Sequence, residues 1–167
     1  MGQQYRLRAL ANEELLAALS SIVRRGNEIT AELLAHLAEL DERQLFLELG
    51  FPSLFAYCVE ALGLCEATAG RRVAAVRVCR LYPEAFARVA SGELHVSALC
   101  LLKQYLNPEN ASELFEACSR KGARQIELLL AARFPRPDVR ERIQRLPAQV
   151  TLNVAHDPAH LRISLES

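Results

Sequence analysis

The chain has 167 residues, of which 51% are hydrophobic and 24% charged, so it can bury one sizeable core and is not expected to be disordered throughout. Its 20 basic residues balance its 20 acidic residues. Because a net charge of zero gives no global positive field, a binding site for nucleic acid would have to be local.

The chain begins with two predicted helices. Asn12 can cap the first, which has two glutamates in its first turn and a stripe of leucine, isoleucine and valine at helical spacing. This helix is expected to end at Gly26, and Asn27 then caps a second helix that continues to a stop at Gly50. Two consecutive amphipathic helices with a tight turn favour an antiparallel hairpin.

Six further helices are predicted by apolar residues at helical spacing, with prolines near several starts and glycines near several ends. Their expected ranges are 53–62, 66–81, 83–91, 95–105, 108–120 and 123–133. Together these elements predict a mostly α protein, a multi-helix bundle whose helical domain spans residues 1–134.

The sequence changes in character after Phe134. Prolines and arginines mark residues 135–147 as a linker. Residues 148–167 then alternate apolar and polar positions around a turn at Asp157-Pro158, which predicts a short β-hairpin. Since a lone hairpin is marginally stable in water, it would pack on the helices, pair with another chain, or open a further sheet domain that this sequence does not contain, and we favour the last.

Charge is distributed unevenly along the chain. Residues 1–60 carry five arginines against nine acidic residues, a net charge of −4. Residues 66–80 carry four arginines against one glutamate, a net charge of +3, and residues 120–145 carry eight basic against three acidic residues, a net charge of +5. Two basic segments are therefore the candidates for contact with a polyanion.

The first basic segment belongs to a predicted helix-turn-helix at about residues 53–81. A corner at Gly63 separates two amphipathic helices, and such a corner sets them at a steep angle, so that the second can enter the DNA major groove. Ala69 and Val73 are expected to face the core, which leaves Arg72 at the margin of the buried face. The candidate DNA-contacting residues are Thr68, Arg71, Arg72, Arg77, Arg80, Arg120, Lys121 and Arg124.

Two resemblances accompany this pattern. The runs LLAHLAELDER from Leu33, LGFPSLFAYC from Leu49 and RRVAA from Arg71 resemble the helical N-terminal region of a bacterial group of HNH-type endonucleases, over roughly residues 28–147. Within that region the chain is similar to the helix-turn-helix core of ParB-type partitioning proteins. The matching residues, in order, are Gly63-Leu64, Arg71-Arg72, Pro83-Glu84 and Ser91-Gly92-Glu93-Leu94. The resemblances imply a helical module that binds double-stranded DNA and targets a nuclease.

The nuclease chemistry itself is not expected in this chain. An HNH site uses a pair of histidines with an asparagine to bind a metal and activate water. Only His156 and His160 are close in sequence, they flank a predicted turn, and no asparagine or histidine follows them. The chain is therefore interpreted as non-catalytic, with no metal site and no cofactor.

The other histidines and the cysteines have structural interpretations. His36 lies on a leucine-rich face and is expected to be a partly buried core residue, while His95 is expected to cap or flank a helix. The five cysteines match neither a zinc pattern nor a disulfide framework, and four lie in apolar helical patterns, so core thiols are expected. Free thiols, and the lack of an apolar run of membrane-spanning length, predict a soluble, cytoplasmic protein without membrane contact.

A second function class stays open. The acidic N-terminal helices could pack against a second copy or a partner domain, and the C-terminal hairpin could add a strand to another sheet. The chain would then be a helical module for protein–protein interaction or dimerisation, without DNA binding. The two classes are compatible, because helix-turn-helix proteins commonly dimerise to read two half-sites.

Overall fold

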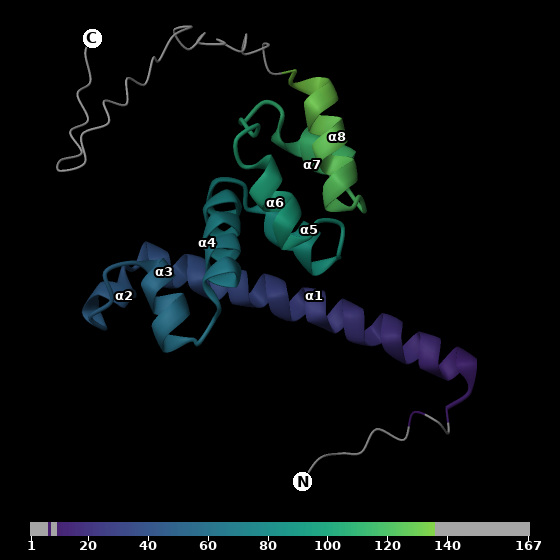
Figure 1. Ribbon diagram of the computed structural model, residues 1–167, viewed down its shortest axis with the longest axis horizontal. Helices are drawn as coiled ribbons and strands as arrows, with labels where there is room; N and C mark the ends of the chain where they lie inside the picture. Colours follow the sequence, from purple (N-terminus) through teal and green to yellow (C-terminus); the bar gives the residue numbers. More distant parts are fainter. Residues whose placement is uncertain (1–6, 8–9, 136–167) are drawn as a thin grey trace, which may run out of the picture. The chain divides into compact units, whose positions relative to one another are not determined.

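The computed structural model describes Leu7 and residues 10–135, and every regular element within them is helical (Figure 1). The elements are α1 (Asn12–Glu42), α2 (Leu45–Glu48), α3 (Leu54–Ala56), the π-helix η2 (Tyr57–Ala61), α4 (Glu66–Leu81), α5 (Glu84–Ala90), α6 (Val96–Leu102), α7 (Ala111–Cys118) and α8 (Ala123–Arg133). The prediction of a mostly α fold is confirmed for this part of the chain. Apart from Pro135, the expected linker at 135–147 and hairpin at 148–167 lie outside the described residues.

Helix α1 is a single helix of 31 residues, so the predicted hairpin with a turn at Gly26 is wrong. A glycine inside a helix costs only about 1 kcal/mol relative to alanine, which is too little to end a helix that packing and good helix formers support. The chain leaves the helix later, at Gln44, whose φ of 55° is left-handed. The short helix α2 then follows, so the expected continuous second helix up to Gly50 is also interrupted.

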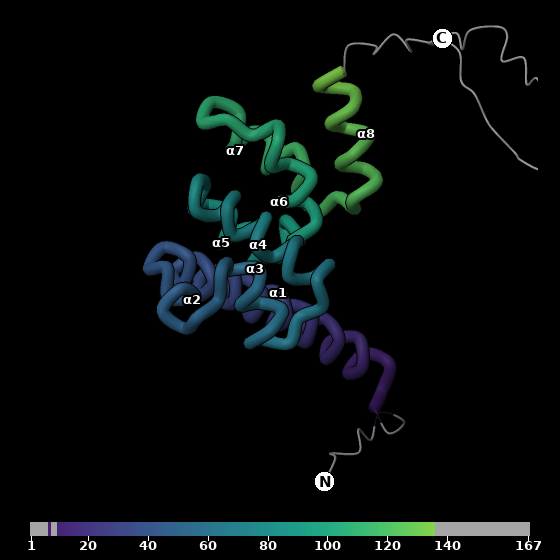
Figure 2. Tube along the Cα trace, turned by 60° about the vertical axis from the view of Figure 1, so that its left-hand side comes forward, coloured from purple at the N-terminus to yellow at the C-terminus, as the bar shows by residue number. Residues whose placement is uncertain are grey.

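The two halves of α1 differ in their surroundings. In the C-terminal half, Ala31, Leu34, Leu37 and Ala38 are buried, and the contacts of α1 are mainly with α5 and α4. In residues 12–26 no side chain is buried. In both views the start of α1, drawn in purple, extends away from the other labelled helices (Figures 1 and 2). None of the helices in the described residues is long and apolar enough to cross a lipid bilayer.

The segment before α4 is helical, as predicted for residues 53–62. The Ser53 hydroxyl accepts a hydrogen bond from the Ala56 amide at 3.1 Å, which caps the start of α3. The helix then widens into η2, in which the Leu62 amide donates to the Tyr57 carbonyl at 3.2 Å. Gly63 follows with a left-handed φ of 66°, so the predicted glycine corner is present.

Helix α4 is the element around which the fold is built. It contacts α1, α3, η2, α5 and α6, and α6 in turn contacts α8. The core is mainly aliphatic with two buried phenylalanines, Phe46 and Phe115, and no polar or charged side chain in the described residues is buried. Its largest fully buried side chains are Leu34, Leu94, Leu99, Leu102, Leu114, Phe115 and Ile126.

The cysteines are free thiols that differ in burial. Cys58, Cys79 and Cys118 are buried, and burial raises the pKa of the Cys79 thiol to about 12. Cys100 is half-buried and Cys65 is exposed. The expectation of core thiols is therefore confirmed for three of the five.

The two described histidines have separate roles. The Nδ1 atom of His95 accepts a hydrogen bond from the Ala98 amide at 3.0 Å, so this ring caps α6 as predicted. His36 is exposed, and its Nδ1 lies 2.8 Å from the carbonyl oxygen of Glu32 on the same helix. The expectation that His36 is a partly buried core residue is wrong, because it lies on the face of α1 opposite to its buried leucines.

Candidate nucleic-acid interface

Hydrogen bonds fix the short segment that connects η2 to α4. The Leu64 amide donates to the Cys58 carbonyl at 3.1 Å across the left-handed Gly63, which closes the end of η2. Cys65 is extended, and its carbonyl accepts a hydrogen bond from the Thr68 amide at 2.9 Å as α4 begins. Two helical segments thus meet at a corner formed by Leu62 to Cys65.

The side chains of α4 that the sequence predicts to face inward do so. Ala69 has no exposed surface and Val73 is 8% exposed. Arg72, beside them, is half-buried. Its charge acts on the Cys58 thiol, whose pKa is raised by burial and partly lowered again by this arginine. Arg72 is therefore less accessible to a ligand outside the fold than the exposed Arg71 and Arg77.

Arg71 points outward from the second turn of α4. It is exposed, and its Nη2 donates to the Thr68 hydroxyl at 3.5 Å. The Cys65 thiol donates to the same hydroxyl at 3.1 Å. Hydrogen bonds with the side chain and backbone of Thr68 lower the pKa of the Cys65 thiol, with a smaller contribution from Arg71. The structure thus brings together Thr68 and Arg71 and adds Cys65, which the sequence could have flagged by its place at the N-terminus of a helix.

Arg80 is engaged within the fold. Its Nη1 lies 2.5 Å from Oδ2 of Asp41, and its Nη2 forms a second ion pair with Glu42. Both carboxylates belong to the end of α1, so these ion pairs join α4 to α1. A guanidinium held by two carboxylates is a poor ligand for phosphate, because binding would require breaking at least one of these pairs.

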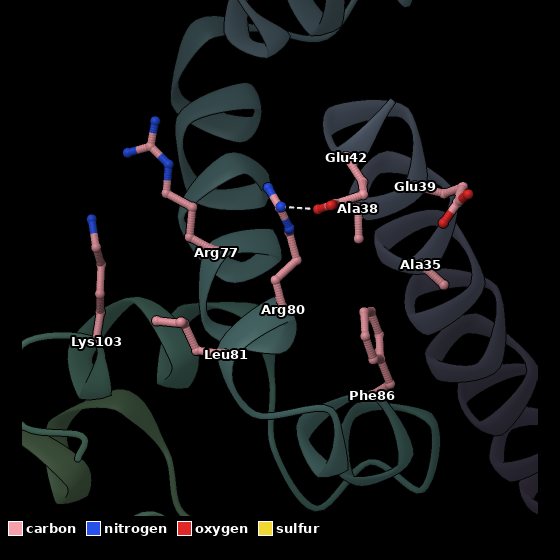
Figure 3. A pocket seen from close by; sticks show the side chains of 9 residues that line it. All are labelled: Ala35, Ala38, Glu39, Glu42, Arg77, Arg80, Leu81, Phe86 and Lys103. Carbon is pink, nitrogen blue, oxygen red and sulfur yellow. Dashed lines mark hydrogen bonds and ion pairs between the residues drawn. The ribbon is translucent and has the colours of Figure 1, made fainter. Parts of the chain in front are cut away.

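Arg77 lies one turn earlier and has different surroundings. With Arg80 and Lys103 it lines a groove of about 860 Å³ between α1, α4 and α5. Figure 3 shows the Arg77 and Lys103 side chains on the side of α4 away from the α1 carboxylates. Among the described residues no carboxylate oxygen lies within 4.0 Å of the guanidinium of Arg71, Arg72 or Arg77.

The second basic segment forms the turn between α7 and α8. Arg120 has a left-handed φ of 56°, and its amide donates to the Glu93 carbonyl at 2.8 Å. The carbonyl of Lys121 lies 3.2 Å from Nε2 of His95, and Arg124 is exposed in the first turn of α8. These contacts fix the turn against the start of α6. In the described part of the chain no hydrogen bond or ion pair joins these three residues directly to the basic residues of α4.

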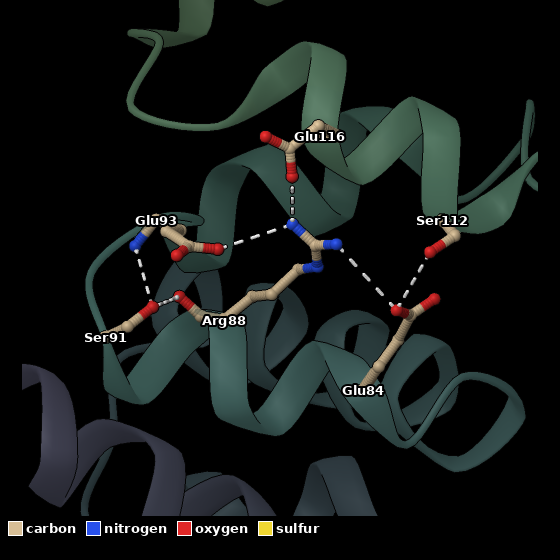
Figure 4. Close-up of polar contacts among 6 residues, drawn as sticks. All are labelled: Glu84, Arg88, Ser91, Glu93, Ser112 and Glu116. Atoms are coloured by element: carbon tan, nitrogen blue, oxygen red, sulfur yellow. Dashed lines mark hydrogen bonds and ion pairs between the residues drawn. The ribbon is translucent and has the colours of Figure 1, made fainter.

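Other arginines are structural. The Arg88 guanidinium lies 3.0 Å from Glu116, 3.3 Å from Glu93 and 3.9 Å from Glu84, so it joins three elements in one ion-pair network (Figure 4). It also lies 5.9 Å from the centre of the Phe115 ring. Arg88 therefore holds parts of the fold together, whereas the exposed Arg71 and Arg77 of α4 remain available to a ligand.

The described residues hold no group of three or more histidine, cysteine, aspartate or glutamate side chains that could bind a metal ion. His156 and His160, the pair considered from the sequence, lie outside those residues. The chain matches no family model, and neither the curated proteins nor the solved structures contain a match to it.

Proposed function

We propose that this chain is a DNA-binding helix-turn-helix module that presents the first two turns of α4 to double-stranded DNA. The observation that carries the proposal is that Arg71 and Arg77 are exposed on the helix after the glycine corner, with no carboxylate within 4.0 Å of either in the described residues. Such arginines keep their donors free for phosphate or for guanine.

The packing of α4 decides which part of it can reach a base pair. Five elements contact this helix, so it cannot lie in the groove along its whole length. Its first two turns remain accessible, and helix-turn-helix proteins contact base edges with the N-terminal residues of the recognition helix. We assign base or groove contact to Thr68 and Arg71.

The remaining cations serve as phosphate ligands in this proposal. Arg77 of α4 and Lys103, which follows α6, line the same groove, while Arg120, Lys121 and Arg124 form a separate basic turn. Phosphate contacts fix the orientation of a protein on DNA without reading its sequence. Arg80 and Arg72 are left out of this set, because the first is paired with two carboxylates and the second is half-buried.

The proposal gives the chain a targeting role rather than a catalytic one. The resemblance to the N-terminal region of HNH-type endonucleases supports that role, since the HNH motif is absent from this sequence. We expect that supercoiled plasmid incubated with the chain and Mg²⁺, Mn²⁺, Ni²⁺ or Zn²⁺ remains supercoiled on an agarose gel. Nicking that is lost in a His156→Ala, His160→Ala double variant would show that the chain itself is a nuclease.

A titration at two salt concentrations tests DNA binding. Fluorescence anisotropy with a labelled duplex should show binding that weakens steeply between about 50 and 200 mM salt, because each phosphate contact releases counterions. For three to five contacts, the logarithm of the affinity should fall with the logarithm of salt with a slope of roughly −2.7 to −4.5. Absence of binding at the lower concentration would refute the proposal.

A further inference from the structure

The first half of α1 carries an aliphatic face that nothing in the described residues covers. We call residues 12–26 the arm, and Leu15, Leu16, Leu19, Ile22 and Val23 the arm face. Leu16, Leu19, Ile22 and Val23 are between 50% and 64% exposed, and Leu15 is half-buried. Contact with the body is seen beyond the arm, where the Asn27 side chain lies close to Gly92 and where Ala31 and three further residues of α1 are buried. Five large aliphatic side chains within three turns of one helix mark an interaction surface.

The area of the arm face suits a weak but specific dimer. Burying one aliphatic side chain removes on the order of 100 Å² of apolar surface from water, so five that are about half exposed offer roughly 250–300 Å² on each copy. Two copies joined by this face bury roughly twice that apolar area. Since apolar atoms make up about 60% of an interface, the total is roughly 1,000 Å², the lower limit for a specific interface.

The charges of the arm indicate which partner covers this face. Glu13 and Glu14 lie at its start, and Arg24 and Arg25 lie at its end, at equal distances in sequence from Leu19. An antiparallel copy centred on Leu19 therefore sets the acidic end of one arm beside the basic end of the other. A parallel copy would set glutamate beside glutamate and arginine beside arginine. The pattern is self-complementary only in the antiparallel direction.

We infer that two copies of this chain dimerise through antiparallel packing of their arms. In this arrangement Leu19 meets Leu19 of the second copy at the twofold axis. The remaining residues of the face pair by level, Leu15 with Val23 and Leu16 with Ile22. The flanking charges set the direction, with Glu13 and Glu14 of one copy beside Arg24 and Arg25 of the second copy.

The length of the arm also fits. Its centre is Leu19, so residues 12–26 of one copy overlap residues 12–26 of the other from end to end. The arm is an α-helix with a rise of about 1.5 Å per residue, and the body of each copy begins after residue 26. Each body therefore lies beyond the N-terminal end of the opposing arm. The bodies are kept apart, and α4 of each copy stays free. The inference does not depend on DNA binding by α4.

Sedimentation equilibrium of the full chain tests the inference. We expect a monomer–dimer equilibrium in the micromolar range, abolished by the Leu19→Glu, Ile22→Glu double variant. Both residues are about half exposed, so the circular dichroism of the variant should match the parent chain. The matched control is Leu128→Glu on α8, where a leucine that is 66% exposed lies outside the arm, and which should leave the equilibrium unchanged. A monomeric parent chain, a dimer that survives the double variant, or a control that is equally disruptive would each overturn the inference.

Charge reversal tests the direction of packing. Arg24→Glu with Arg25→Glu, and Glu13→Arg with Glu14→Arg, should each weaken self-association on the order of tenfold, because four like-charged contacts replace four favourable ones. An equimolar mixture of the two variants should recover the parent affinity, since every acidic end again meets a basic end. Because recovery requires both variants to be folded, it also controls for the loss of the hydrogen bond from the Ala11 amide to Glu14. Failure of the mixture to associate more tightly than either variant would overturn the antiparallel assignment.

Discussion

The arm of α1 and helix α4 are both built from aliphatic residues and arginine, yet the fold uses them in opposite ways. In α4 the aliphatic side chains are buried by five neighbouring elements, and arginines such as Arg71 and Arg77 remain at the surface. In the arm the aliphatic side chains themselves are exposed. A helix with a buried apolar face and exposed cations suits a polyanion, whereas an exposed apolar stripe suits a protein partner.

The largest effect that separates the two regions is the cost of removing a leucine. Leu99 in α6 is fully buried, so Leu99→Ala should lower the free energy of unfolding by about 2–5 kcal/mol. Leu19→Ala in the arm should change it by less than about 0.5 kcal/mol at a concentration where the chain is monomeric. Urea denaturation followed by circular dichroism measures both. Equal losses would mean that the arm belongs to the core.

Alanine substitutions at two glycines, one in a turn of the body and one in the arm, should change the stability of the fold in opposite directions. Gly92 has a left-handed φ of 77°, and a Cβ atom there would lie 2.5 Å from the Asn27 amide nitrogen, so Gly92→Ala should destabilise the fold by at least about 1–2 kcal/mol. Gly26 has open space around it in a helical conformation, so Gly26→Ala should stabilise the fold by up to about 1 kcal/mol. Thermal unfolding of the two variants should move the midpoint in opposite directions. A loss of stability in Gly26→Ala would contradict the continuous helix α1.

Arg80 tests whether the ion pairs of α4 are structural. Arg80→Ala removes the pairs with Asp41 and Glu42 and should cost on the order of 0.5–1 kcal/mol, since these groups are partly exposed. DNA affinity should change less than it does in Arg77→Ala, because Arg77 has no such partner. The reverse order of the two affinities would show that Arg80 leaves its carboxylates to bind phosphate.

The cysteines provide a smaller, chemical test of the same surface. Cys65 is exposed with a lowered pKa, so its thiolate forms at a lower pH than in a free cysteine, and it should react first with an aromatic disulfide reagent. Cys79 is buried with a pKa of about 12, so it should stay unreactive until the chain unfolds. A Cys65→Ser variant should lose the fast phase. A fast phase that persists would show that the start of α4 is not exposed as described.

Local signals predicted the helices well where glycine and proline agreed with packing. Residues 66–81 and 123–133 were expected to be helical, and α4 and α8 have these bounds. Gly63 was recognised because it ends one amphipathic pattern just before another begins. Gly26 carried the same kind of signal, but no turn residues or break in the apolar pattern accompanied it, and the helix continues through it.

The surroundings of each side chain could not be predicted in the same way. The leucine stripes of the arm and of the C-terminal half of α1 look alike in sequence. Only the fold shows that the stripe of the C-terminal half is buried while that of the arm is exposed. Arg77 and Arg80 are three residues apart, yet Arg80 meets carboxylates about 40 residues away in the chain. Which arginines remain unpaired is therefore a property of tertiary structure.

The central claim is that α4 binds DNA through its exposed arginines, and an Arg71→Ala variant tests it most directly. The matched control is Arg43→Ala, which removes one exposed arginine at the end of α1, where it is paired with Glu39. Both variants have the same net charge, so a purely nonspecific field would weaken them equally. Measured by anisotropy with one labelled duplex, Arg71→Ala should bind about 5- to 150-fold more weakly than the parent chain, at about 1–3 kcal/mol per good contact, while Arg43→Ala stays within about twofold. A folded Arg71→Ala variant that binds as tightly as Arg43→Ala would contradict the assignment of α4 as the DNA-binding helix.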